Sequence, residues 1–131
     1  MVPNGLRTWF VIHFVADTLF AIPMFFAPVF TMELLGWTVV DPVATRLVGA
    51  ALFGIGIESL LGRNANVDAY RAMLRMKSIW CGTATIGLAW SALEGGPPLV
   101  WALTGVFAVF CAVWNKYRIQ LGPGEPAETA A

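Results

Sequence analysis

Apolar residues gather in four long runs along the chain, separated by short stretches rich in polar residues, glycine and proline. A helix needs roughly 20 mostly apolar residues to cross the hydrocarbon core of a bilayer. The pattern predicts helices over about 6–30, 42–61, 69–93 and 97–117. We therefore expect an all-α fold, a four-helix transmembrane bundle within residues 1–121. Residues 122–131 are rich in glycine, proline, alanine and glutamate, a composition typical of a disordered tail.

Proline, glycine and aspartate mark the ends of these runs. Asp41 is a favourable N-cap, and Pro42 suits the first position of the second helix. The turn at 94–98 places two glycines before two prolines, which ends one helix and begins the next. Pro23 and Pro28 should kink or end the far half of the first helix. Residues 31–41 are expected to form a connector at the membrane interface.

The composition agrees with lipid as the surroundings of the chain. Of its 131 residues, 58% are hydrophobic and 12% are charged, and the mean hydropathy is +0.71. Soluble domains carry about 25% charged residues. The formal net charge is zero, so no basic surplus indicates a nucleic-acid partner. The expected surroundings are the lipid bilayer, with protein partners or further copies of the chain as open possibilities.

The distribution of basic residues predicts the orientation. Lysine and arginine are enriched on the cytoplasmic side of membrane proteins. With a cytoplasmic N-terminus, the inner side collects seven of the eight basic residues, and only Arg46 lies toward the outer side. The seven are Arg7, Arg63, Arg71, Arg75, Lys77, Lys116 and Arg118. We therefore expect a multi-pass protein of the inner (plasma) membrane with both termini in the cytoplasm.

Four ionisable residues inside the predicted spans form a candidate intramembrane polar site. Such groups are costly in a bilayer and are functional candidates for that reason. His13 and Asp17 are four residues apart, so they share one face of the first helix, and Asp17 lies near mid-membrane. Asp17 could serve as a proton, ion or headgroup site, or be a buried carboxylate paired with His13. Glu58 and Lys77 lie at similar depths, which suggests an ion pair that fixes helix register.

Small residues on the second predicted helix indicate close helix packing. Ala50 and Gly54 lie between Arg46 and Glu58 at four-residue spacing, and we expect them to face another helix. Gly49 and Gly56 should widen this smooth face from adjoining surfaces.

Motifs for common chemistries are missing from the sequence. His13 is the single histidine, so bis-histidine haem ligation within one chain is impossible. The chain has no CxxC, HExxH, P-loop or G-x-S-x-G pattern, which argues against a metal enzyme or hydrolase of familiar kind. No metal site is predicted, and the cofactor, if the protein uses one, is left open.

The stretch DPVATRLVGAALFGIGIESLLGR, residues 41–63, resembles the second helix of small four-helix bacterial membrane proteins of the DoxX-like kind. Shared features are an Asp-Pro start, an arginine one turn in, and a Gly/Ala-rich helix that ends in arginine. The resemblance implies a compact four-helix bundle in the inner membrane and no particular catalytic residues.

Three functions fit this pattern. The first is a non-enzymatic membrane component, such as an accessory or scaffold subunit, which smooth helix faces and short loops favour. The second is a small proton-coupled transporter centred on Asp17. The third is an intramembrane protein or enzyme that binds a lipid, quinone or pigment through His13, Asp17 and Glu58.

Overall fold

A computed structural model of the chain describes residues 1–124. Within this range the fold is all-α, with five α-helices, one short 3-10 helix and no strand. The helices are α1 (Asn4–Phe26), α2 (Pro28–Leu34), α3 (Pro42–Leu61), α4 (Val67–Leu93) and α5 (Leu99–Leu121), with η1 (Gly62–Asn64) after α3. The remaining part of the predicted disordered tail, residues 125–131, lies outside the described residues.

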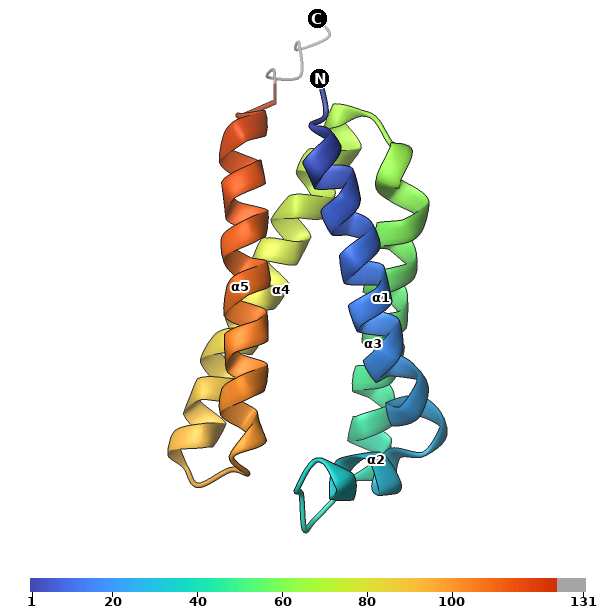
Figure 1. The fold of residues 1–131 in the computed structure, drawn as a ribbon, viewed down its shortest axis with the longest axis vertical. Coiled ribbons are helices and arrows are strands. Elements are labelled where there is room, and N and C mark those ends of the chain that lie inside the picture. Colours follow the sequence, from blue (N-terminus) through green and yellow to red (C-terminus); the bar gives the residue numbers. More distant parts are fainter. Residues whose placement is uncertain (125–131) are drawn as a thin grey trace, which may run out of the picture.

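The four long helices form two antiparallel hairpins (Figure 1). Helix α1 packs along α3, and α4 packs along α5. The hairpins meet at the end of the molecule where α1 begins and α5 ends, and they diverge toward their tips (Figure 1). The apolar core lies at this meeting end and includes Leu6, Phe10, Tyr70, Leu74 and Trp114. The two hairpins therefore pack against each other at one end of the molecule.

The first predicted helix is two helices in the structure. It ends at Phe26, and α2 begins at Pro28, which has no N–H to continue the hydrogen-bond ladder. The hydroxyl oxygen of Thr31 lies 2.9 Å from the carbonyl oxygen of Pro23 and 2.7 Å from that of Ala27, so its one proton is shared between two acceptors at the break. The predicted helix over 6–30 is thus interrupted, which confirms the expected effect of Pro28, whereas Pro23 lies inside α1. Helix α2 also occupies part of the predicted connector.

The other helix ends follow from their capping residues. The carboxylate of Asp41 accepts hydrogen bonds from the backbone N–H groups of Val43 and Ala44, at 2.8 and 3.2 Å. Asn66 caps α4 by accepting from the N–H of Ala69 at 2.9 Å. Helix α3 has the predicted bounds, whereas α4 begins at Val67 rather than at 69, and α5 runs from Leu99 to Leu121 rather than from 97 to 117.

Among residues 1–124, three stretches of helix are long and apolar enough to cross a membrane. They are Asn4–Phe26, Pro42–Asn64 and Leu99–Leu121, each of 23 residues. A helix of that length spans about 35 Å, against about 30 Å for the hydrocarbon core. Leu19, Leu47 and Val109 are among the large apolar side chains that these helices expose. Such surfaces suit contact with lipid, and the fold is that of a multi-pass membrane protein.

Candidate functional site

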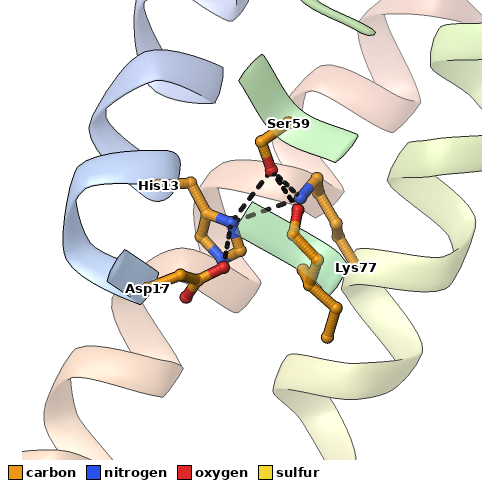
Figure 2. A network of polar contacts seen from close by, with 5 residues as sticks. His13, Asp17, Ser59 and Lys77 are labelled. Atoms are coloured by element: carbon orange, nitrogen blue, oxygen red, sulfur yellow. Dashed lines mark hydrogen bonds and ion pairs between the residues drawn. The ribbon is translucent and has the colours of Figure 1, made fainter. Parts of the chain in front are cut away.

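Four polar side chains meet in the interior where the two hairpins come together (Figure 2). His13 and Asp17 project from α1, Ser59 from α3 and Lys77 from α4, and each of the four is buried. We call this group the polar cluster. It joins one hairpin to the other, because Lys77 is its single member from the second hairpin. Buried ionisable groups are expensive unless partners satisfy them, so the contacts within the cluster decide its chemistry.

Lys77 is fully buried and is held by both polar and aromatic groups. Its Nζ atom donates to Oγ of Ser59 at 2.6 Å and lies 3.2 Å from Nδ1 of His13. The ring centroids of Phe10 and Trp114 lie 5.1 and 5.4 Å from the same nitrogen. An ammonium group is attracted to the faces of aromatic rings at such distances. The amine is thus fixed in place without a carboxylate in direct contact.

With Lys77 present as an ammonium group, its contacts and those of Ser59 assign the proton positions on His13. The Ser59 hydroxyl has one proton, which it donates to the carbonyl oxygen of Ile55 at 2.7 Å. It therefore accepts from Lys77 and has no proton for His13. Lys77 has only donors, so Nδ1 of His13 accepts from its ammonium group. A neutral imidazole with an acceptor at Nδ1 carries its proton on Nε2, which makes no hydrogen bond to any described residue.

Asp17 lies next to His13 and retains unused capacity to accept hydrogen bonds. Its Oδ2 atom is 3.1 Å from Nδ1 of His13, one helical turn away. Oδ2 nevertheless has no hydrogen-bond partner among the described residues. The carboxylate has room because position 56 on α3 is glycine: a β-carbon there would lie 2.8 Å from Cβ of Asp17. Asp17 therefore offers an acceptor group that the protein itself does not use.

A cavity of about 310 Å³ between the hairpins reaches His13 and Asp17. Apart from these two residues, its walls are almost entirely apolar, and all five α-helices contribute to them. Trp80, Ala84 and Leu88 line it from α4, and Phe107 and Phe110 from α5. Small-molecule sites are concave, mostly apolar and equipped with a few polar groups, with volumes of about 300–1,000 Å³. We call this space the inter-hairpin cavity, and its composition fits a lipid-soluble molecule.

Three of the four predicted site residues come together, and Glu58 does not. Glu58 is exposed on α3. Among the described residues, no carboxylate oxygen lies within 4 Å of the Lys77 ammonium nitrogen, which is the distance limit for an ion pair. Ser59, the next residue, takes the position expected for Glu58. The predicted Glu58–Lys77 ion pair is therefore corrected to a Ser59–Lys77 hydrogen bond.

The small residues of α3 fall into two groups, one at the contact with α1 and one exposed on the outer surface. A β-carbon at Gly49 would contact the backbone of Ala21 and Phe25 on α1 at 3.3 and 3.2 Å, so Gly49 lies at the helix contact, as Gly56 does. Ala50 and Gly54 are exposed instead, and a β-carbon at 54 would meet no described atom within 4 Å. Their expected place against another helix of this chain is corrected accordingly.

The period of the α-helix explains both corrections. Residues spaced by four advance 400°, so a stripe drawn at that spacing drifts about 40° per step around the helix. The buried face of α3 instead follows Thr45, Gly49, Leu52, Gly56 and Ser59, with alternating spacings of four and three. This alternation was the signal in the sequence that could have identified Ser59.

No family model, curated protein or solved structure matches the chain. The resemblance of residues 41–63 to DoxX-like proteins therefore stays a prediction. Within residues 1–124, no group of three or more histidine, cysteine, aspartate or glutamate side chains is placed to hold a metal ion. The site must be understood from its own geometry.

Proposed function

We propose that this chain is a four-span protein of the inner membrane that binds a lipid-soluble molecule within the bilayer. The observation that carries the proposal is the inter-hairpin cavity, whose apolar walls reach the His13–Asp17 pair. An apolar body would occupy the cavity, and a polar group would lie at the cluster. Ligand binding would explain why the protein buries ionisable groups, which is energetically unfavourable in a membrane.

The shape of the second hairpin supports a fourth crossing. Helix α4 has 27 residues and runs beside α5, so the two share the same depth (Figure 1). Its first turns are polar, but beyond them it exposes Ile79, Ile86, Trp90 and Leu93. This outward apolar surface suits lipid.

The positions of the basic residues support cytoplasmic termini. The first turns of α1, η1, the first turns of α4 and the last turns of α5 share one end of the molecule (Figure 1). They contain six basic residues: Arg7, Arg63, Arg71, Arg75, Lys116 and Arg118. Arg46, near the start of α3, belongs to the opposite end (Figure 1). The positive-inside rule places the first end in the cytoplasm.

Ligand binding uses the cavity and the cluster together, which the two other functions do not. An accessory or scaffold subunit needs neither a hollow interior nor three buried ionisable side chains. A proton-coupled carrier centred on Asp17 needs a carboxylate that gains and loses charge freely. Such a carrier would use Asp17 but would have no need of the apolar inter-hairpin cavity beside it. The third of the functions expected from the sequence is the one that the geometry favours.

The test compares the lipids bound to two variants, in each of which one alanine is replaced by phenylalanine. Ala84 lines the cavity on α4, and Ala84→Phe would fill part of it, whereas Ala108 is exposed on α5 and Ala108→Phe would change only the outer surface. Each protein is purified in lipid nanodiscs, extracted with organic solvent and analysed by mass spectrometry. We expect a defined molecule with the unmodified protein and with Ala108→Phe, and its loss from Ala84→Phe.

Ala16→Phe fills the same cavity from α1 and is a second, independent test. Thermal unfolding would show that each variant is folded. Equal lipid profiles for all four proteins would contradict the proposal.

A further inference from the structure

We infer that the bound molecule is an uncharged amphiphile whose polar end is a hydroxyl group, held between His13 and Asp17. This inference rests on the proposed function and specifies the chemical class of the ligand. It depends on two features of the polar cluster: its charge balance and the hydrogen-bonding groups that it leaves unused.

The charge balance favours an uncharged ligand. Lys77 and Asp17 carry opposite charges when both are ionised, and with a neutral His13 the cluster then has no net charge. A cationic or anionic head would leave the buried group with a net charge in surroundings of low dielectric constant, which is unfavourable. An uncharged head leaves the balance intact. Fatty acids and lipophilic amines in their charged forms are therefore disfavoured.

The unused hydrogen-bonding groups favour a hydroxyl over other uncharged heads. With Lys77 donating to Nδ1, the proton of His13 is on Nε2, where no described residue accepts it, and Asp17 Oδ2 has no donor. A hydroxyl both accepts and donates, so one group could satisfy both residues. A ketone or quinone carbonyl would accept from His13 and leave Asp17 unsatisfied. An ether would do the same, and a hydrocarbon would satisfy neither.

The length of the cavity favours a chain-like apolar body. On α1 the lining runs from His13 to Met24, an axial distance of about 16 Å, and it continues to Trp37 beyond α2. The aromatic side chains along this path are Phe20, Trp37, Trp80, Phe107 and Phe110. An alkyl or isoprenoid chain of a dozen carbons fits this elongated space better than a compact ring does.

Tryptophan fluorescence provides the measurement, because Trp37 and Trp80 line the cavity and bromine quenches indole emission. The probes are bromododecane and three ω-bromododecyl compounds: the alcohol, the carboxylic acid and the trimethylammonium salt. Each is titrated into the full chain in phosphatidylcholine nanodiscs at neutral pH. The same titration is repeated with Ala84→Phe, whose cavity is partly filled. The quenching of this variant comes from probe dissolved in the lipid, and it is subtracted from the quenching of the unmodified protein. We expect the alcohol to reach half-maximal quenching at a concentration roughly tenfold below that of each of the other three probes. One or two hydrogen bonds from the alcohol to the polar cluster would produce a difference of this size.

Asp17→Asn tests the charge argument separately. The amide keeps an oxygen acceptor but removes the negative charge, so the cluster retains the single positive charge of Lys77. The acid should then bind several-fold tighter than it does to the unmodified protein, and the ammonium compound should bind no better. Ala108→Phe is the matched surface control and should reproduce the unmodified protein with all four probes.

The outcomes separate this inference from the proposal on which it rests. Equal quenching by all four probes above the Ala84→Phe background would overturn the hydroxyl assignment but leave the binding function standing. Tightest binding of the acid or of the ammonium compound to the unmodified protein would overturn it as well. Quenching by every probe at the Ala84→Phe level, with that variant folded, would overturn the binding function itself.

Discussion

Gly56 on α3 lies directly against Asp17 on α1, so close that a β-carbon at position 56 would be 2.8 Å from the β-carbon of the aspartate. The helix contact and the polar cluster are therefore the same place in the fold. The glycine allows the two backbones to approach, and the approach buries the carboxylate next to His13. A change in packing at this position must also change the chemistry of the site.

Gly56→Ala should destabilise the protein by about 1–3 kcal/mol, because the added methyl group has to displace Asp17 or the helix that carries it. Gly54→Ala is the matched control, since it adds the same group to the same helix where no described atom lies within 4 Å. Unfolding in detergent measures both. The control should be neutral or slightly stabilising, because alanine favours helix over glycine. Equal losses in the two variants would contradict the close contact at Gly56.

Ser59→Ala should destabilise the protein by about 1–3 kcal/mol, since it removes an acceptor from the fully buried ammonium group of Lys77. Glu58→Gln is the comparison at the neighbouring position. Glu58 is exposed and makes no ion pair with Lys77, so the loss of its charge should leave the unfolding free energy nearly unchanged. If Glu58→Gln proved the more damaging of the two, the assignment of Ser59 as the partner of Lys77 would be wrong.

Lys77→Met should be more severe, at about 3–5 kcal/mol, because the Asp17 carboxylate would lose the positive charge of its cluster. The double variant Lys77→Met/Asp17→Asn contains neither charge and should recover part of that loss. A double-mutant cycle measured by unfolding gives the coupling between the two positions. A coupling free energy near zero would show that the two charges do not depend on each other.

The sequence predicted the helices well because their signals are local. Asp41 and Pro42 mark the start of α3, and the apolar runs mark the long helices within a few residues. The pairing of His13 with Asp17 was also accessible, since both belong to one helix and their spacing fixes their separation.

The rest of the site depends on how the helices meet, which local patterns do not determine. The rotation of α3 about its axis decides whether Glu58 or Ser59 faces Lys77. That rotation follows from the contact of α3 with α1 through Gly49 and Gly56. The inter-hairpin cavity was not predicted either. It arises from the divergence of two hairpins that are joined at one end, and no single helix carries a signal for it.

The fourth crossing can be tested by cysteine labelling at the two ends of the second hairpin. In a background of Cys81→Ala/Cys111→Ala, cysteine is introduced at Thr38, at Glu94 or at Gln120, all of them exposed. Intact cells are treated with a maleimide reagent that does not cross membranes. With four crossings, Thr38→Cys and Glu94→Cys should react from outside, and Gln120→Cys only after the cells are permeabilised.

A chain in which α4 does not cross would give a different labelling pattern. The turn at Glu94 would remain on the inner side, and α5 would carry the last helical turn to the outside. Glu94→Cys would then be protected and Gln120→Cys would react in intact cells. Because the two positions exchange their behaviour between the models, a difference in overall reactivity cannot imitate the result. Thr38→Cys is expected to react in both cases, so it controls for access of the reagent to the outer face.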